Sequence, residues 1–401
     1  MDLPHLAGPS PINPITCIDM HTAGEPTRII WSNIPPLSGT LLSQRSQAKS
    51  QFDSFRRLLM LEPRGHYDMY GAILRPETEL VASGQADIGV LFMHNEGFST
   101  MCGHATIALG RFLVDVDEKV FPRRKQLRYD PVSRTTSLNL HVPCGIVQVT
   151  VPTLSSSGKS DASRPVSFVS VPSFAKAVSL RVSVPEEYRW SELGGRSSVT
   201  VDVAYGGAYY CMVSAEELGF PGGLGGVNLQ DMDRASKLLK DTVVSDPELQ
   251  YLTQDERTPE EGFLYGVMIT DSRLGHVSAV EGSAASRAQL RAASEETGLC
   301  FFANQQVDRS PTGSCVAARV ALAHATGSLA KGEKRVYNSL VTRAHRGLAG
   351  FVGSVFGDAE SGGGVRVCVE GYAYYTGYHT FVVEQEDGLG VDGFSVRDMA
   401  L

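Results

Sequence analysis

The residues best suited to chemistry lie in one stretch, Met101 to Val114, in which a thiol comes just before a predicted helix. Cys102 precedes Gly103 and His104, and a mostly apolar run follows them. Small residues at a helix start leave the first backbone N–H groups open to a ligand. The positive end of the helix dipole also favours a thiolate beside it. The stretch therefore predicts a base or nucleophile next to a carboxylate-binding site.

A second stretch, in the other half of the chain, repeats this organisation. It consists of Asp308, Arg309, Ser310, Pro311, Thr312, Gly313 and Ser314, followed by an apolar run that starts at Cys315. Thr312 takes the position that Cys102 has in the first stretch, so two helix N-termini are expected to converge on one small ligand. The alternative is a pair of ordinary capped helices, in which Asp308 is a helix cap without a chemical role.

Together these motifs resemble the proline racemase family, whose two-cysteine members carry Met-Cys-Gly-His in one half and Asp-Arg-Ser-Pro-Cys-Gly-Thr in the other. Other matching stretches, which extend the resemblance over nearly the whole chain, are 19–28, 61–66, 94–97 and 377–381. Thr312 replaces the second cysteine, and this replacement is similar to the trans-3-hydroxy-L-proline dehydratase branch. Cys315 departs from the family pattern, which has a small residue such as Gly at that position.

The resemblance implies an enzyme that needs no cofactor and dehydrates trans-3-hydroxy-L-proline to 1-pyrroline-2-carboxylate and water. Cys102 is expected to remove the α-proton as a general base, and His104 to orient the substrate or support the thiolate. Asp308 is expected to accept the ring ammonium of the substrate. Backbone N–H groups for the substrate carboxylate are expected at Gly103, Gly313 and Ser314. Weaker candidates, expected to be structural or to lie behind the site, are His21, His66 and His94.

The stereochemistry of this substrate limits the number of acid–base groups that the reaction needs. In trans-3-hydroxy-L-proline the α-hydrogen and the hydroxyl share one ring face, so a single base on that face, Cys102, can take the proton and assist the departure of hydroxide. The hydroxyl of Thr312 has too high a pKa to reprotonate the other face well, so racemisation should be suppressed. Two alternatives stay open: a racemase or 2-epimerase of proline or hydroxyproline, which the missing second thiol opposes, and a non-catalytic amino-acid-binding relative, which the intact Cys102 opposes.

Composition limits the partners of the chain. The 401 residues suggest about two or three domains, and 42% hydrophobic residues are enough for sizeable cores. A formal net charge of −8, with acids and bases interspersed, argues against nucleic acid or an anionic membrane as a partner, and no apolar run is long enough to span a bilayer. No His and carboxylate set has metal-ligand spacing, and no dinucleotide fingerprint is present. We therefore expect a small-molecule substrate, 3-hydroxyproline, no metal or cofactor, and a homodimer.

Cysteine usage favours a reduced compartment. The seven cysteines are dispersed and form no Cys-x-x-Cys motif, which is typical of an intracellular protein, and we expect a cytoplasmic location. Cys17, Cys144 and Cys368 lie in apolar surroundings and are expected to be inert core residues. The N-terminal residues 1–14 have neither a basic start nor an apolar core, so they do not resemble a secretory signal.

Periodicity predicts more strands than helices. Strands are predicted at 15–18, 27–31, 70–74, 88–93, 138–142, 146–151, 166–171, 199–205, 262–270, 351–356 and 365–369. Helices are predicted at 46–60, 101–114, 231–240 and 285–295. Each half thus has one central apolar helix among strands, which favours two α+β domains.

The family resemblance makes this fold prediction more specific. It implies two pseudo-symmetric, diaminopimelate-epimerase-like lobes, each a curved sheet around a central helix, with the active site in the cleft between them. We assign residues 1–195 to the first lobe, which carries Cys102 and is joined by the C-terminal strand at 376–401. Residues 196–375 form the second lobe, which carries Asp308 and Thr312.

Overall fold

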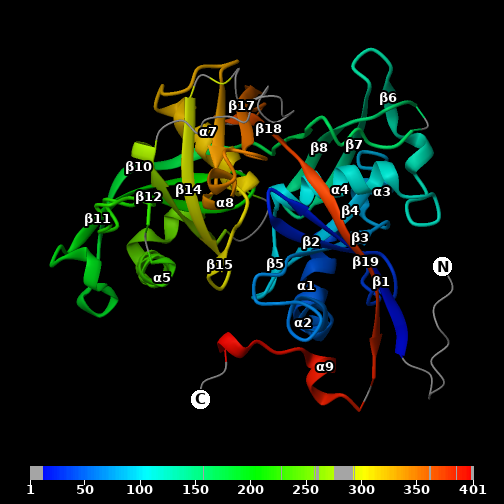
Figure 1. Ribbon diagram of the computed structural model, residues 1–401, viewed down its shortest axis with the longest axis horizontal. Helices are drawn as coiled ribbons and strands as arrows, with labels where there is room; N and C mark the ends of the chain where they lie inside the picture. The colour runs from blue at the N-terminus through cyan, green and yellow to red at the C-terminus, as the bar shows by residue number, and fades with distance from the viewer. Residues whose placement is uncertain are drawn as a thin grey trace.

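The strands of this protein form one continuous mixed sheet that wraps around two buried helices. The computed structural model describes residues 12–398, except 157, 227, 257, 259–261, 275–291, 293, 361–362 and 385. In Figure 1 the elements from blue to cyan gather on one side of the molecule, and those from green to orange gather on the other. Strands and helices are not arranged as repeating parallel β–α–β units, so the predicted α+β class is confirmed.

The first half of the chain supplies one part of this sheet. Its elements are β1 (Ile12–Thr22), β2 (Glu25–Ile30), α1 (Leu41–Gln51), α2 (Asp53–Met60), β3 (Gly71–Arg75), α3 (Glu79–Ala82), β4 (Ile88–Met93), β5 (Phe98–Ser99), α4 (Gly103–Asp115), β6 (Arg128–Asp130), β7 (Thr135–Val142), β8 (Gly145–Pro152) and β9 (Val166–Val169). The pairing runs from β1 through β2, β3, β4 and β7 to β8 and β9. Helix α4 packs against β1, β2, β8 and β9.

The second half supplies the other part. Its elements are β10 (Phe174–Ser183), β11 (Ser198–Tyr205), β12 (Tyr209–Ser214), α5 (Leu229–Ser245), β13 (Leu264–Asp271), β14 (Ser294–Phe302), β15 (Gln306–Val307), α7 (Gly313–Ala325), β16 (Lys334–Asn338), α8 (Leu340–Ala344), β17 (Phe351–Asp358), β18 (Val365–Gly371), β19 (Ala373–Val383) and α9 (Gly388–Asp392). The pairing runs from β10 through β11, β12, β13, β14, β16 and β17 to β18. Helix α7 packs against β10, β11, β12, β17 and β18.

Two connections join these parts. Strand β9 pairs with β8 on one side and with β18 on the other, which makes the sheet continuous. Strand β19 then leaves the second part and pairs antiparallel with β1, with Cys17 opposite His379. Figure 1 shows β19 crossing the molecule to lie beside β1. The two ends of the chain therefore contribute adjacent strands.

Helices α4 and α7 are buried because they are apolar almost all round. Every residue from Gly103 to Gly110 is buried in α4, and every residue from Gly313 to Ala321 is buried in α7. Both helices begin with glycine and carry small or aliphatic side chains, which lets strands pack closely on several sides. The residues that begin these helices are consequently held by the whole core.

Most predicted elements are present, and two predictions need correction. The helix predicted at 46–60 is two helices, because α1 starts earlier, at a Thr40 cap whose side chain accepts from the Ser43 N–H, and the helical path breaks at Phe52. The helix predicted at 285–295 lies mostly outside the described residues, but its last two positions, Ser294 and Glu295, begin β14 instead. The predicted hairpin at 138–151 and the pairing of 351–356 with 365–369 are confirmed.

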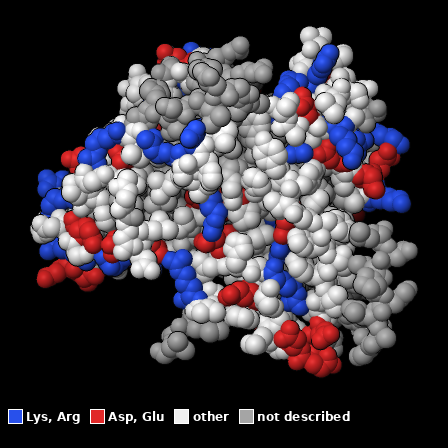
Figure 2. Space-filling model, in the orientation of Figure 1, with Lys and Arg blue, Asp and Glu red and all other residues white. Residues whose placement is uncertain are grey.

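The surface mixes charges of both signs. Figure 2 shows Lys and Arg interspersed with Asp and Glu over the coloured part of the face that it draws. In the described ranges, no helix combines the length and the apolar composition that a bilayer crossing requires.

Candidate active site

The N-termini of α4 and α7 meet glycine to glycine, which confirms the predicted convergence of the two motifs. A Cβ atom placed on Gly103 would lie 2.4 Å from the Cα atom of Gly313, and one placed on Gly313 would lie 2.8 Å from the Cα atom of Gly103. Only glycine allows two backbones to approach this closely. The open ends of both helices therefore face the same small space.

A narrow cavity of about 10 Å³ lies between the two helix starts. All seven residues predicted for the site line it: Cys102, Gly103, His104, Asp308, Thr312, Gly313 and Ser314. Five further lining residues were not predicted: Tyr70, Met101, Tyr210, Tyr265 and Phe302. A cavity of this volume has room for about one water molecule. A ligand the size of proline needs the two helix starts to move apart before it can enter.

Cys102 caps α4 and carries the only thiol among the residues that line this cavity. Its sulfur accepts a hydrogen bond from the Ala105 N–H at 3.4 Å and lies 3.3 Å from Nδ1 of His104. Burial raises the pKa of the thiol well above its ordinary value, and the Ala105 N–H acts in the opposite direction. The helix start thus favours the thiolate, as the sequence predicts, but desolvation has the larger effect on the pKa in this narrow cavity.

His104 is held as a neutral imidazole. Burial lowers its pKa to about 3, with the Pro26 carbonyl acting in the opposite direction. Its ring meets the edge of the Tyr70 ring with centroids 4.8 Å apart, and its backbone carbonyl accepts a hydrogen bond from the Thr22 hydroxyl at 2.9 Å. An imidazole that stays neutral can exchange hydrogen bonds with the Cys102 sulfur but cannot supply a positive charge to it.

Asp308 is a buried carboxyl that caps a turn and not a helix. One carboxylate oxygen accepts a hydrogen bond from the Ser310 N–H at 2.7 Å, and the side chain is 4% exposed. Burial raises its pKa to about 6, against the hydrogen bonds from Ser310. The helix that follows begins at Gly313 and has Thr312 as its cap, so the alternative interpretation of Asp308 as a simple helix cap is wrong.

Thr312 starts α7 in an unusual backbone conformation. Its φ of 63° lies in the left-handed region, which a β-branched residue adopts rarely and at a cost. Its hydroxyl makes no hydrogen bond within the described ranges, and α7 has no side-chain cap. The first N–H groups of α7, at Gly313 and Ser314, are therefore open at the cavity. The Ser314 hydroxyl is bonded to that of Tyr210 at 2.7 Å.

Behind the cavity, a buried glutamate connects the first half of the chain to the second motif. Glu25 is fully buried, and one of its oxygens accepts a hydrogen bond from the Arg309 N–H at 2.7 Å. Burial raises its pKa well above the ordinary value, and the charge of Asp308 raises it further. Arg309 also pairs with Asp68 at 2.9 Å. These contacts fix the position of Asp308 relative to the strands that precede α4.

The three weaker histidine candidates lie outside the cavity. Nδ1 of His21 accepts a hydrogen bond from Gly24 in the turn that follows β1. His66 is exposed. His94 is buried against the rings of Tyr70 and Tyr265, with centroids 6.0 and 5.7 Å away, so it packs behind two residues of the cavity wall. Among the described residues, no group of three or more His, Cys, Asp or Glu side chains could hold a metal ion.

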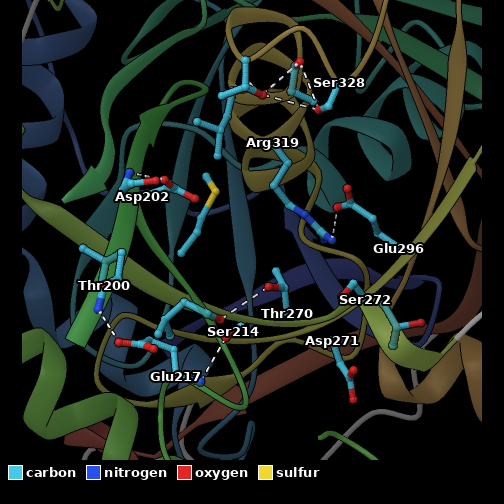
Figure 3. A pocket seen from close by; sticks show the side chains of 18 of the residues that line it. Thr200, Asp202, Ser214, Glu217, Thr270, Asp271, Ser272, Glu296, Arg319 and Ser328 are labelled. Atoms are coloured by element: carbon cyan, nitrogen blue, oxygen red, sulfur yellow. Dashed lines mark hydrogen bonds and ion pairs between the residues drawn. The ribbon is translucent and has the colours of Figure 1, made fainter. Parts of the chain in front are cut away.

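A larger pocket, of about 450 Å³, lies behind α7, and Figure 3 shows its polar lining. Several lining groups are already paired: Arg319 donates to Glu296 at 2.6 Å, and Glu217 accepts from the Thr200 N–H at 2.7 Å. Glu296 also pairs with Arg335, and these two arginines keep its pKa below the ordinary value although burial acts to raise it. The ion pairs anchor α7 to β14, so this pocket is a structural feature and not the convergence point of the motifs.

Comparison with known proteins shows which family the chain belongs to. A model of the proline racemase family matches residues 17–395, which is nearly the whole chain. The chain belongs to the proline racemase family. It is 38% identical to the trans-3-hydroxy-L-proline dehydratase of Homo sapiens, over 98% of each chain, and 32% identical to a 3-hydroxyproline 2-epimerase of Burkholderia multivorans, over 96% of this chain and 98% of that one.

A solved structure shares the fold. The hydroxyproline epimerase of Agrobacterium vitis, crystallised with bound trans-4-hydroxy-L-proline, matches with a TM-score of 0.72 over 98% of this chain and 97% of that chain. The two sequences are 19% identical, so the match supports the fold alone. It agrees with the mixed sheet and buried helices described above.

Several of the other stretches that match the proline racemase family have a structural role. Arg28 forms a two-pronged pair with Asp19, with both distances 2.9 Å, and also donates to the carbonyls of Leu59 and Arg64 at 2.7 Å. His379 on β19 lies 3.2 Å from the same Asp19 carboxylate. Asp19, Arg28 and His379, which come from two of these stretches, thus hold the β1–β19 pair in place.

Proposed function

We propose that this chain is a cofactor-independent hydro-lyase that converts trans-3-hydroxy-L-proline to 1-pyrroline-2-carboxylate and water. The observation that carries the proposal is the pairing of Cys102 and Thr312 at the facing N-termini of α4 and α7. One helix start thus presents an ionisable thiol, and the other presents an alcohol in the same position. Curated relatives named as dehydratases of this substrate, 38% and 39% identical over nearly the whole chain, support the same conclusion.

We propose a role for each lining residue that the motifs predict. The Cys102 sulfur removes the α-proton, and neutral His104 hydrogen-bonds to that sulfur. Asp308 accepts the ring ammonium, which suits a carboxylate held in a buried site. The N–H groups that hold the substrate carboxylate, and so stabilise negative charge as the α-carbon loses its proton, belong to Gly103, His104, Gly313 and Ser314. Because Thr312 cannot deliver a proton to the opposite ring face, the carbanion-like intermediate loses hydroxide instead of inverting.

The elimination gives an enamine first. Because the α-hydrogen and the 3-hydroxyl share a ring face, the sulfur that receives the proton lies next to the leaving oxygen. Loss of water leaves a double bond between the α- and β-carbons, and this enamine tautomerises to 1-pyrroline-2-carboxylate. Burial holds the Cys102 pKa high in the narrow cavity. Proton abstraction therefore requires a ligand, or the opening that admits it, to favour the thiolate.

A 2-epimerase is the second candidate, since the relative from Burkholderia multivorans carries the name 3-hydroxyproline 2-epimerase. Two assays separate the candidates. A dehydratase forms pyrroline carboxylate from trans-3-hydroxy-L-proline and does not change the optical rotation of L-proline. An epimerase gives the D-configured product without pyrroline carboxylate. A protein that only binds pyrrole-2-carboxylate and turns over neither substrate would be the non-catalytic relative.

We further propose the two-lobe arrangement and a homodimer. Pairing of β1 with β19 supports the assignment of the C-terminal strand, 376–401, to the lobe of residues 1–195. The second lobe is then 196–375, although the pairing of β10 with β11 favours a boundary nearer residue 170. Light scattering of the purified protein tests the dimer. Dialysis against a chelator, which should leave activity unchanged, tests the proposal that no metal takes part.

A further inference from the structure

The Tyr265 hydroxyl is a buried polar group that makes no hydrogen bond of ordinary geometry among the described residues. Tyr265 lies at the start of β13 and is 3% exposed, and its ring packs against those of His94 and Phe302, with centroids 5.7 and 5.5 Å away. These contacts fix the ring. The hydroxyl reaches the cavity wall, and in the described part of the chain no hydrogen bond of ordinary geometry satisfies it, although the Tyr70 and Ser99 hydroxyls lie near enough to affect it. A buried hydroxyl without a partner costs about 1–3 kcal/mol, which points to a ligand group that completes it.

This hydroxyl lies on the Cys102 side of the cavity. Burial raises the pKa of Tyr265 well above its ordinary value, and the neighbouring Cys102 sulfur raises it further, while hydrogen-bonding contacts with the Tyr70 and Ser99 hydroxyls lower it. Tyr70 and Ser99 are bonded to each other at 2.5 Å, and the Tyr70 ring contacts His104. The Tyr265 oxygen is thus grouped with the residues of the α4 side, and it keeps its proton as a hydrogen-bond donor.

Tyr210, on the α7 side of the cavity, differs from Tyr265 in the hydrogen bonding of its hydroxyl. Its ring lies 5.9 Å from that of Tyr265, but its hydroxyl is already bonded to Ser314, at 2.7 Å. Tyr70 is likewise bonded to Ser99. Of the three tyrosines that line the cavity, only Tyr265 keeps a hydroxyl without a hydrogen-bond partner among the described residues.

We propose that the Tyr265 hydroxyl binds the 3-hydroxyl of the substrate and so selects proline derivatives that carry a leaving group at that carbon. The inference rests on the proposed function. Because the base is Cys102 and the α-hydrogen shares a ring face with the 3-hydroxyl, the leaving oxygen must lie on the Cys102 side, where the Tyr265 hydroxyl is. A site built to hydrogen-bond a hydroxyl discriminates strongly against ligands without one, since its own donor then stays unpaired.

In the elimination step, the proposed role of Tyr265 is to donate a hydrogen bond to the leaving oxygen. The Cys102 sulfur takes the α-proton, the electrons of that C–H bond form the double bond, and the C3–O bond breaks with its electron pair on oxygen. The oxygen then takes the proton from the Cys102 thiol, which releases water and restores the thiolate. Tyr265 donates a hydrogen bond to the oxygen as its charge develops and keeps its own proton. Removal of one such donor lowers kcat by roughly 10²–10³-fold in other enzymes.

The test compares Tyr265→Phe with wild type and with Tyr337→Phe. Tyr337 is fully buried beside Arg319, and its hydroxyl also lacks a partner in the described ranges. It does not line the cavity, so its variant removes the same kind of group without touching the site. We expect Tyr265→Phe to lower dehydration by about 10²-fold, and Tyr337→Phe to leave it unchanged. The inhibition constant of pyrrole-2-carboxylate, which has no 3-hydroxyl, should stay within about threefold in both variants.

A second readout follows the α-proton. In deuterated water, Tyr265→Phe should return more deuterated substrate per product molecule than wild type does, because proton abstraction continues while C–O cleavage slows. Dehydration within threefold of wild type refutes the assignment, and so does a parallel loss of pyrrole-2-carboxylate binding, which indicates a packing role. If the wild-type protein forms no pyrroline carboxylate, the proposed function fails and the Tyr265 assignment fails with it. If wild type forms the product and Tyr265→Phe forms it equally well, only the Tyr265 assignment is refuted.

Discussion

At the level of single residues, the Cys102 thiol, the His104 imidazole and the Asp308 carboxyl are each shifted by burial towards their uncharged forms. A proline-like ligand brings a carboxylate and an ammonium into this space. Its carboxylate can bind to open N–H groups at two helix ends, and its ammonium favours the charged form of Asp308. The ionisation of the site and the binding of its ligand are consequently coupled.

Replacement of the thiol tests its role as the base. Cys102→Ser should lower turnover of trans-3-hydroxy-L-proline by roughly 10³-fold or more, because a serine hydroxyl ionises far less readily than a thiol. Binding of pyrrole-2-carboxylate, measured by calorimetry, should persist, since the N–H groups at both helix starts remain. Turnover like that of wild type in the serine variant would refute the assignment of Cys102.

The pKa of about 6 for Asp308 predicts a pH dependence of binding. The carboxylate must be charged to hold the ring ammonium, so the affinity for L-proline as a competitive inhibitor should fall about tenfold per pH unit below pH 6 and stay level above it. Asp308→Asn should bind weakly at every pH, with no such slope. An unchanged slope in the asparagine variant would assign the titration to another group, such as Glu25.

Thr312 is expected to decide between elimination and inversion. Thr312→Cys places a second thiol opposite Cys102 and should produce detectable inversion of 4-hydroxyproline, which lacks the 3-hydroxyl. The gain can be small, because the new thiol must be placed to within about half an ångström. Deuterium exchange at the α-carbon, followed by chiral separation, measures it. A folded variant that binds pyrrole-2-carboxylate but inverts nothing would show that Thr312 alone does not set the outcome.

At the level of elements, α4 and α7 are held from both ends. Their N-termini are locked together by the contact of Gly103 with Gly313, and α7 is anchored farther along by Arg319, which pairs with Glu296 of β14. Removal of one partner from a buried ion pair of this kind typically destabilises a protein by about 3–5 kcal/mol. The position of Thr312 therefore depends on contacts that lie well away from the cavity.

Gly103→Ala tests the contact between the helices. Its Cβ would lie 2.4 Å from the backbone of Gly313, so we expect a loss of about 1–3 kcal/mol in stability and roughly 10²-fold in activity, as the helix starts are forced apart. Gly388→Ala is the matched control, because Gly388 also begins a helix but has open space around it. Urea denaturation and the dehydration assay measure both variants, and equal effects would contradict this account of the contact.

At the level of the whole molecule, six of the seven cysteines are buried, and all seven are free thiols. Burial raises the pKa of Cys211 and Cys315 to about 12, from an ordinary value of 9.0. Cys315, the departure from the family pattern, is thus an inert core thiol, fully buried in α7. Because the unfolded thiols ionise first as the pH rises, the folded state loses stability between about pH 9 and 12.

Alkaline denaturation measures this effect. Each such thiol should lower the free energy of unfolding by up to about 1.4 kcal/mol per pH unit above pH 9, and other groups that titrate in this range add their own contributions. Under reducing conditions, Cys211→Ala should therefore be less stable than wild type at pH 8, through the cavity that it creates, but should lose less stability between pH 8 and pH 10.5. Parallel curves for the two proteins would show that Cys211 does not contribute.

The sequence predicted the two helix starts and most core strands because those signals are local. Small residues before an apolar run and alternating apolar residues need no knowledge of distant contacts. Tyr70, Tyr210 and Tyr265 could not be found in this way, because a tyrosine on a buried strand looks like any aromatic core residue until its hydroxyl is placed. Strands β10, β12, β14 and β16 were missed as well, since aromatic and polar residues interrupt their alternation.

The pairing of β1 with β19 has a consequence for synthesis. About 350 residues separate these strands, so at about 5–20 residues per second a ribosome takes roughly 20–70 seconds to deliver the partner of β1 after β1 itself has emerged. During that time one edge of β1 can offer its N–H and C=O groups to other chains. The nascent protein thus has an unpaired edge on β1 until β19 is made. Molecular chaperones that bind extended segments have the most time to bind the chain at this edge.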